Sequence, residues 1–275
     1  MKLEDVRPAD CYAHAQRLLT EVASIRDEMG RAEDARPLPE VTEARPRDVY
    51  FAALATWNKA DRLASEVGAQ PVRFPPAVPI LREVRPGHVI QVIDAVLRQI
   101  DGIKGRLQIA ETAPLPAIDA KRQPCDVLMT LLRVNRELSR LLERPFTPSD
   151  VYRTVALAST YAVRLGATAE LAPFERRRKP QHCYDRLLAC HAAVAGLIAK
   201  QGEPTLAAGK TPADVLPGDV YDLASLVLGE IAFLHSLTPT AMPLHAFEPT
   251  ASGHRLPAHV DQLARTLEAQ LATIK

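Results

Sequence analysis

The segment Pro148-Ser149-Asp150-Val151-Tyr152 carries the signal on which the predicted fold depends. It reads as proline, any residue, aspartate or histidine, a small apolar residue, and then tyrosine or another large side chain. Seven further segments share this pattern, and each stands in front of an apolar stretch with helical periodicity. Their prolines are Pro8, Pro46, Pro86, Pro124, Pro180, Pro217 and Pro257. We therefore predict eight helices with one common start signal.

The third residue of each segment predicts a helix N-cap. An aspartate there accepts a hydrogen bond from an N–H of the first turn and complements the positive end of the helix dipole. The proline two residues earlier keeps the incoming chain extended. In the segment quoted above, Thr147 offers an alternative cap with Pro148 in the first helical position. The predicted capping residues are Asp10, Asp48, His88, Asp126, Asp150, His182, Asp219 and His259.

Behind each start signal, apolar residues recur at alternating steps of four and three residues. In the fourth segment they are Val127, Leu131, Val134, Leu138 and Leu141. This is the spacing of a heptad seam, so we expect the helices to pack side by side at shallow crossing angles. Most of the tyrosines follow the small apolar residue directly, where a ring can pack beside the seam and keep its hydroxyl near the polar cap.

The connections predict an all-α fold of two tandem four-helix halves, residues 1–144 and 145–275. One helix recurs about every 38 residues, and the connections are long except for the short 144–149 segment in the middle. An extended linker of about 16 residues reaches roughly 50 Å, whereas a 19-residue helix is about 28 Å long. The chain can therefore return along one helix and begin the next in the same direction, which predicts parallel neighbours. Tetratricopeptide-type repeats differ, since they have two helices in about 34 residues.

The long linkers are rich in proline, and a proline-apolar-proline group precedes several start signals. One such group is Pro114-Leu115-Pro116-Ala117-Ile118. We expect these linkers to be extended and held against the bundle by their apolar residues.

Composition limits the classes of function. Of the 275 residues, 47% are hydrophobic and 24% charged, as in an ordinary globular protein. The net charge of +1 gives no electrostatic case for nucleic acid or an anionic membrane. No apolar run approaches the roughly 20 residues of a membrane span. The first residues lack an apolar signal-peptide region, so we expect a cytoplasmic protein as written, or a periplasmic one if a signal peptide has been removed.

The pairs His182-Cys183 and Cys190-His191 form the candidate metal site, because thiolate and imidazole groups suit zinc. The alternative is structural. Both cysteines occupy seam positions, His182 occupies a cap position, and two helical turns separate the sulfur atoms by about 10 Å. We favour the structural interpretation. The four cysteines (Cys11, Cys125, Cys183 and Cys190) contain no CxxC spacing, and we expect free thiols.

The charged run Arg176-Arg177-Arg178-Lys179 is the candidate ligand site, for a phosphate or an acidic partner in front of a helix start. The alternative is a solvated linker. The pairs Asp10–His14 and Asp185–His191 suggest acid–base chemistry, but no nucleophile motif accompanies either, so no catalytic residue is assigned. No phosphate-binding loop, dinucleotide fingerprint or haem motif is present in the sequence, and no cofactor is predicted.

We expect a non-catalytic helical-repeat binding or scaffold protein with a protein partner, because nearly every distinctive residue recurs by register and catalytic residues are usually single. The alternative is a small-ligand or metal-binding bundle, either a binding protein or an enzyme, that uses the His and Cys residues near the helix starts. A third hypothesis is self-association into a homo-oligomer through the seam of the last helix, residues 260–275.

Overall fold

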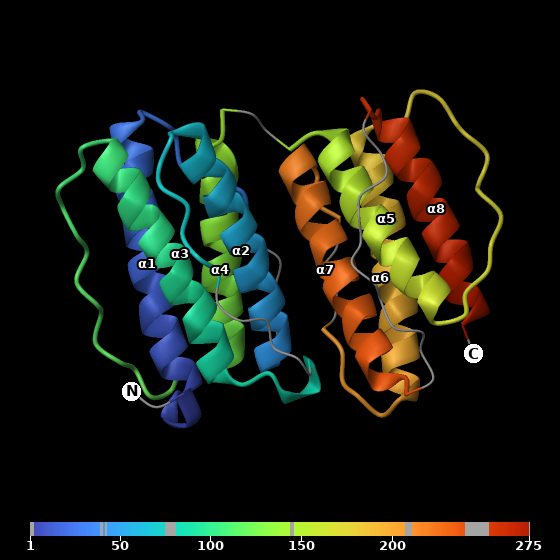
Figure 1. Cartoon of the computed structure of the whole chain (residues 1–275), viewed down its shortest axis with the longest axis horizontal. Coiled ribbons are helices and arrows are strands. Elements are labelled where there is room, and N and C mark those ends of the chain that lie inside the picture. Colours follow the sequence, from blue (N-terminus) through green and yellow to red (C-terminus); the bar gives the residue numbers. More distant parts are fainter. Residues whose placement is uncertain are drawn as a thin grey trace. The chain divides into compact units, whose positions relative to one another are not determined.

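A computed structural model describes residues 3–38, 41, 43–74, 81–143, 146–206, 211–239 and 253–274. Within these ranges the chain is all-helical, with eight α-helices, two short 3-10 turns (Leu3–Asp5 and Leu81–Glu83) and no strand (Figure 1). The predicted number of helices is confirmed. They are α1 (Pro8–Glu28), α2 (Pro46–Glu66), α3 (Pro86–Arg106), α4 (Pro124–Leu141), α5 (Pro148–Arg164), α6 (Pro180–Lys200), α7 (Pro217–Leu237) and α8 (Pro257–Thr273).

Every helix begins at the proline of its start signal, three residues earlier than the first seam residue. Proline suits the first helical position because its φ is already helical and it lacks the N–H that would be unpaired there. The residue before the proline is the extended N-cap, so the predicted N-cap assignment of the aspartates and histidines is wrong. Only the alternative considered for α5 is right, with Thr147 as N-cap and its Oγ1 accepting from Asp150 N at 3.3 Å.

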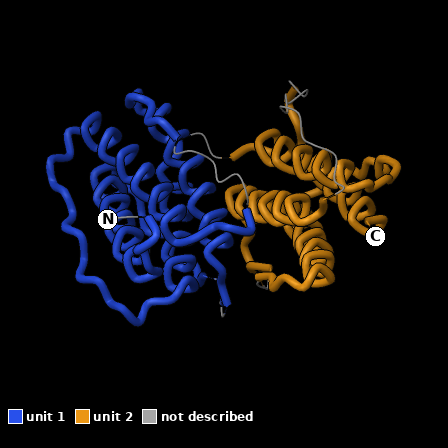
Figure 2. The backbone as a smooth tube through the Cα atoms, turned by 60° about the horizontal axis from the view of Figure 1, so that its bottom comes forward, with its two compact units in different colours: residues 1–145 blue, residues 146–275 orange. Residues whose placement is uncertain are grey.

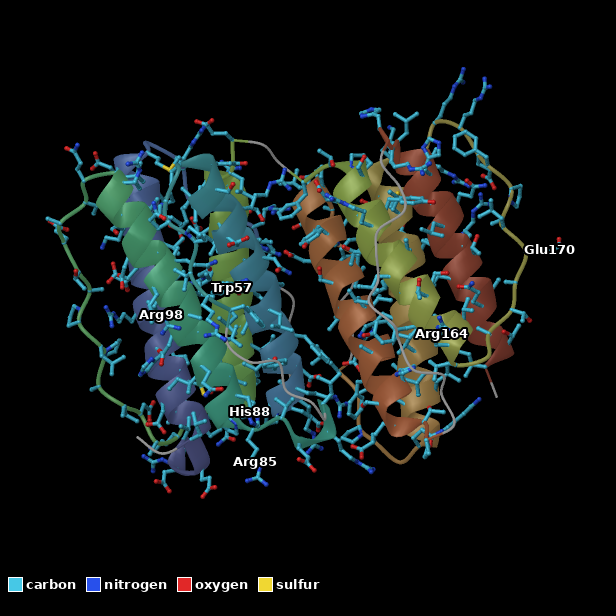
Figure 3. The ribbon with its side chains drawn as sticks, in the orientation of Figure 1. Trp57, Arg85, His88, Arg98, Arg164 and Glu170 are labelled. Carbon is cyan, nitrogen blue, oxygen red and sulfur yellow. The ribbon has the colours of Figure 1, made fainter. Side chains whose placement is uncertain are left out.

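The aspartate or histidine is instead the third helical residue, and its side chain reaches back to the N-cap. Asp10 accepts from Arg7 N at 2.7 Å, and His88 Nδ1 accepts from Arg85 N at 3.0 Å (Figure 3). The same hydrogen bond is made by Asp48, Asp126, Asp150, His182, Asp219 and His259. Each therefore satisfies an N–H at the start of its helix, which is the physical role expected from the sequence at a different position.

The chain divides into two compact units, Met1–Pro145 (unit 1) and Phe146–Lys275 (unit 2) (Figure 2). In unit 1 the helices contact each other around a ring in the order α1, α3, α2, α4. In unit 2 the order is α5, α7, α6, α8. The two orders correspond helix for helix along the chain, and helices joined by the first or third connection of a unit lie at opposite corners of its ring.

The four helices of each unit are parallel, since hydrogen bonds join residues at similar distances from their helix starts. Between α1 and α3, Cys11 Sγ donates to Pro86 O at 3.3 Å and His14 Nδ1 lies 2.6 Å from Asp94 Oδ1. Equivalent hydrogen bonds link further neighbours: Gln16–Thr130, Gln99–Asp61 and Lys59–Ser139 in unit 1, and Cys183–Pro257, Cys190–Ala264 and Ser159–Gln270 in unit 2. Helix α7 is joined to α5 by the rings of Tyr161 and His235, whose centroids are 5.4 Å apart. Long connections therefore run back along each bundle, as residues 107–123 and 165–179 do in Figure 1.

Buried helix side chains hold these returning segments. In unit 1 the backbone N–H of Ala113 donates to Glu21 Oε1 at 2.8 Å, and that of Asp34 donates to Glu137 Oε1 at 3.3 Å. Both glutamates are almost completely buried. Leu115 and Ile118 are about half exposed, so anchoring of this linker by its apolar residues is a wrong prediction. An extended backbone has unpaired N–H groups that need acceptors, which the buried carboxylates supply. The groups around residues 39 and 75–80 lie outside the described residues.

The apolar seam forms the core of both units. Its positions lie 3, 7, 10, 14 and 17 residues after the first proline of each helix, and 38 of the 40 residues at these positions are buried. The two exceptions are Leu165 and Ile274, which both belong to the last layer of unit 2. The seam prediction therefore holds everywhere except at one end of one unit.

Helix α7 is long and apolar enough to cross a membrane by length and composition, with a mean hydropathy of 1.4 over its most apolar window. Half of that window is buried in the structure. Val227, Ile231 and Phe233 are among its fully buried residues, and α7 packs against α5 and α6. Core helices of bundles have this composition because they are apolar on several faces.

Candidate functional site

The open end of unit 2 is the most distinctive feature of the described structure. We call layer 17 the set of residues 17 positions after the first proline of each helix in a unit. In unit 1 the side chains of layer 17 are at most 1% exposed; they are Ile25, Leu63, Ile103 and Leu141. In unit 2 layer 17 consists of Leu165, Leu197, Leu234 and Ile274, of which the first and last are only half buried. The same apolar layer is thus fully buried in unit 1 and partly exposed in unit 2.

Unequal helix lengths explain why this end is open. Helices α6 and α7 have 21 residues each, whereas α5 and α8 have 17. The four are parallel and start together, so α5 ends about 6 Å short of α6 and α7, at 1.5 Å per residue. Gly166 ends α5 with a φ of +88°, a conformation that glycine adopts without strain. In unit 1, by contrast, three of the four helices have 21 residues.

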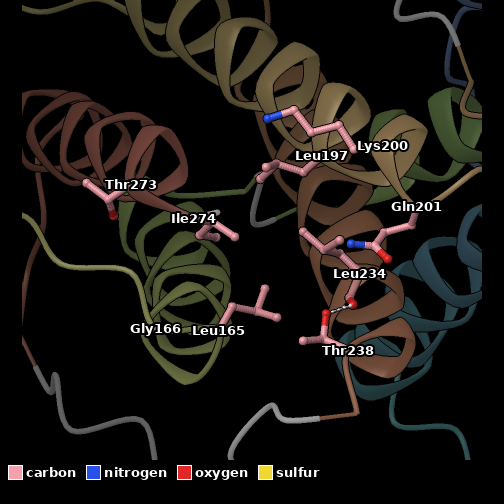
Figure 4. A pocket seen from close by; sticks show the side chains of 9 residues that line it. All are labelled: Leu165, Gly166, Leu197, Lys200, Gln201, Leu234, Thr238, Thr273 and Ile274. Atoms are coloured by element: carbon pink, nitrogen blue, oxygen red, sulfur yellow. Dashed lines mark hydrogen bonds between the residues drawn. The ribbon is translucent and has the colours of Figure 1, made fainter.

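The missing turns leave a pocket of about 390 Å³ between the C-terminal ends of the four helices (Figure 4). Layer 17 forms its apolar wall. Polar side chains surround it, contributed by α6, α7 and α8. The lining residues are Leu165, Gly166, Leu197, Lys200, Gln201, Leu234, Thr238, Thr273 and Ile274.

The residues one turn beyond layer 17 differ in character between the units. Twenty-one positions after the proline, unit 1 has Met29, Val67 and Leu107, all apolar and half buried. At the same register, unit 2 has Gln201 and Thr238. The change replaces an apolar cover by hydrogen-bonding side chains at the mouth of the pocket. A site for a small molecule has this combination of an apolar interior and a few polar groups.

The polar groups around the pocket are of two kinds. The Thr238 hydroxyl donates to Leu234 O at 3.0 Å, and the Thr273 hydroxyl donates to Gln270 O at 2.7 Å, so both hydrogens are used within their own helices. The side chains of Lys200 and Gln201 have no hydrogen-bond or ion-pair partner among the residues that the structure describes. The groups free to meet a ligand are therefore an ammonium and an amide.

The structure does not bring the four predicted metal ligands together. His182 Nδ1 accepts from Lys179 N at 2.9 Å and so serves as a cap. Cys183 Sγ donates to Pro257 O and Cys190 Sγ to Ala264 O, both on α8. Burial raises the pKa of each thiol to about 12, which keeps both protonated. Over the described ranges, no three His, Cys, Asp or Glu side chains are grouped as metal ligands.

His191, the fourth of these residues, is 2% exposed on α6. Its Nε2 has no hydrogen-bond partner in the part of the chain that is described. Burial lowers the pKa of the imidazole, so it is neutral. The four cysteines are free thiols. In place of the two acid–base pairs suggested by sequence, His14 pairs with Asp94, and Asp185 accepts from the Thr211 hydroxyl at 2.8 Å.

One residue of the basic run before α6 forms ion pairs, and the other three are exposed to solvent. Arg178 pairs with Glu175 and, at 3.2 Å, with Asp261, a carboxylate that is 2% exposed on α8. Arg178 therefore holds the connection against the bundle. Arg176, Arg177 and Lys179 are exposed. Binding of a phosphate or an acidic partner by this run stays a prediction.

Sequence reasoning missed the pocket, although a signal was present. Glycines also follow α1, α2 and α6, where Gly30, Gly68 and Gly202 lie 22 residues after the first proline of the helix. Gly166 lies only 18 residues after Pro148. This one-turn difference predicts a shorter helix, but it exposes layer 17 only if the four helices are parallel and in register.

Comparison of the chain with protein-family models, curated proteins and solved structures finds no significant match. The geometry of the pocket is therefore the basis for a functional proposal.

Proposed function

We propose that this chain is a non-catalytic binding protein, and that the pocket at the open end of unit 2 binds a small, largely apolar molecule. One observation carries the proposal: layer 17 is fully buried in unit 1, whereas two of its four residues in unit 2, Leu165 and Ile274, are partly exposed, and polar side chains stand one turn beyond it where unit 1 has apolar ones. A ligand would complete the core of unit 2 in the way that Met29, Val67 and Leu107 complete that of unit 1.

The driving force for such binding is the removal of apolar surface from water, worth about 25 cal/mol per Å². Leu165 and Ile274 are the half-buried seam residues whose side chains would be covered. A pocket of about 390 Å³ falls in the range of small-molecule sites. The lining contains no acid–base pair and no activated nucleophile, which favours binding over catalysis.

We also propose that the chain is a tandem array of one helix-and-connection repeat, with proline-rich extended connections, arranged as two four-helix halves. Three observations support this: the shared start signal, the common seam register, and the corresponding order of helices around the two rings. On this proposal unit 1 is the closed form of the repeat bundle and unit 2 the form adapted to hold a ligand.

A scaffold role with a protein partner is the second candidate. The N-caps of α7 and α8 are Leu216 and Leu256, both more than 40% exposed. The N-caps of unit 1 are instead Arg7, Arg45, Arg85 and Gln123. Two exposed leucines at helix starts favour a protein contact at that end of unit 2, and sedimentation velocity of the protein and its Leu256→Arg variant distinguishes self-association from a monomer.

The ligand-binding proposal is tested by filling the pocket. A neutral, environment-sensitive dye such as Nile red should bind the purified protein at one saturable site. Leu165→Trp puts a larger side chain into the pocket wall and should weaken dye binding at least about tenfold, the equivalent of 1.4 kcal/mol. Leu107→Trp, at a half-buried residue near the covered end of unit 1, is the matched control and should bind as the original chain does. Equal dye binding by both variants contradicts the proposal.

A further inference from the structure

The hydrogen-bonding groups of the pocket indicate the chemical class of its ligand. Lys200 contributes an ammonium with three N–H donors, and Gln201 contributes an amide with two. Neither side chain has a partner among the described residues, and both line the pocket. The hydroxyl hydrogens of Thr238 and Thr273 are already donated to backbone carbonyls. The mouth thus presents the N–H donors of Lys200 and Gln201 together with acceptor oxygens of Gln201 and the threonines, and Lys200 carries a full positive charge.

The helix dipoles have the opposite effect to Lys200 on an anion, because the helix C-termini at this end carry partial negative charge. Each helix C-terminus carries about half a negative charge, located on its last unpaired carbonyls. In α5 and α6, Gly166 N donates to Val163 O and Gly202 N donates to Ala199 O. In α7 and α8, threonine hydroxyls satisfy carbonyls of the last turn. Each of these bonds satisfies one carbonyl of a last turn, and Lys200 carries the one full formal charge among the residues that line the pocket.

We propose that the pocket takes a monocarboxylate with an apolar chain, such as a medium-chain fatty acid; this inference rests on the proposed function. The chain lies against layer 17, and the carboxylate accepts hydrogen bonds from Lys200 Nζ and Gln201 Nε2. A ligand with an amine in place of the carboxylate meets the like charge of Lys200. A neutral alcohol keeps the apolar contacts and loses the charge-assisted hydrogen bonds, which are the stronger kind.

The test is calorimetric titration of the full chain with decanoate, decan-1-ol and decylamine, each below its aggregation concentration. We expect one decanoate per chain, bound about tenfold more tightly than decanol, as one charge-assisted contact of about 1.4 kcal/mol gives. Decylamine should bind more weakly than decanol. Lys200→Met should remove most of the preference for decanoate over decanol, and the hydrogen bond from Gln201 accounts for the rest. Lys121→Met, at an exposed lysine of unit 1, should change neither.

Gln201→Leu is a second variant with the same readout, and it should weaken decanoate more than decanol. Circular dichroism confirms that each variant is folded. Equal affinity of decanoate and decanol in both the original chain and Lys200→Met overturns the carboxylate inference and leaves the binding function standing. Tightest binding of decylamine overturns the inference in the same way. Absence of binding by all three compounds overturns the proposed function together with the inference.

Discussion

Buried polar residues recur 13 positions after the proline of most helices. They are Glu21, Lys59, Gln99, Glu137, Glu230 and Gln270. Glu21 shows what this position does: it pairs with Lys104 of α3 and accepts from the backbone of the returning 107–123 segment. Removing one member of a buried ion pair costs about 3–5 kcal/mol. This single residue position therefore joins a helix, its neighbour and a connection.

At the corresponding positions of unit 2, a pair of aromatic rings replaces the buried ion pair. Tyr161 and His235 occupy the places of Glu21 and Lys104, with ring centroids 5.4 Å apart in an edge-to-face arrangement. Such a pair needs no buried charge, and it is worth about 0.5–1.5 kcal/mol beyond its burial. The polar residue 13 positions after the proline is a second repeating signal in the sequence, separate from the apolar seam.

His191 gives unit 2 a dependence on pH. Burial lowers the pKa of the folded imidazole below its ordinary value, so below about pH 6.5 the unfolded chain binds a proton that the folded chain does not. Stability should therefore fall as pH drops from about 6.5 towards the folded pKa, by up to 1.4 kcal/mol per pH unit for one proton. Urea unfolding followed by circular dichroism at pH 7.5 and 5.5 measures the effect.

The variant His191→Leu isolates this contribution. It keeps the side chain apolar and of similar size and removes the titrating group. The capping histidines His182 and His259 remain in both proteins, so any contribution from them cancels in the comparison. The variant should lose less stability between the two pH values than the original chain does. An equal loss in both proteins excludes His191 as the cause.

At the scale of the helix, the third residue is the feature that repeats without exception. All eight side chains accept a hydrogen bond from the N-cap N–H. Asp10→Ala removes that acceptor from α1 and should cost about 1 kcal/mol. Asp10→Asn keeps an acceptor oxygen and loses only the charge at the helix start, so it should cost about half as much or less. Urea unfolding monitored through Trp57, the one tryptophan of the chain, compares them.

The outcome that contradicts this assignment is equal destabilisation by Asp10→Ala and Asp10→Asn. The charge would then matter and the hydrogen bond would not. Arg7 lies 3.8 Å from the Asp10 carboxylate but is mostly exposed, so its ion pair contributes little to the difference.

Helix positions were predictable from the sequence to the extent that they depend on local rules. The seam residues and the proline signals located all eight helices, because periodicity and proline geometry act within one turn. The N-cap assignment failed since Asp at the cap and Asp at the third residue leave the same local pattern. The pocket lay beyond reach because it depends on the register of four helices brought together from distant parts of the chain. Leu165 is a seam residue by pattern and a pocket residue only by comparison with α6 and α7.

At the scale of the molecule, each unit has its own ring of four helices and its own buried seam. We expect residues 1–145 and 146–275, produced separately, to fold with helical circular dichroism spectra. The Trp57 transition in urea should have the same midpoint in fragment 1–145 as in the full chain, because Trp57 is buried within unit 1. A large shift of that midpoint, or a fragment without helical signal, shows that one unit needs the other.

The parallel arrangement also determines how a unit responds to tension. The chain enters unit 1 at the start of α1 and leaves it at the end of α4, and these points lie at opposite ends of the bundle. An up-and-down bundle of four helices has its entry and exit at the same end, so a pull peels its helices apart one after another. A pull on unit 1 acts along its helix axes and has to slide the interlocked seam residues past each other together. The helices of unit 1 are about 27 to 32 Å long, at 1.5 Å per residue, and we expect the unit to resist extension along that length.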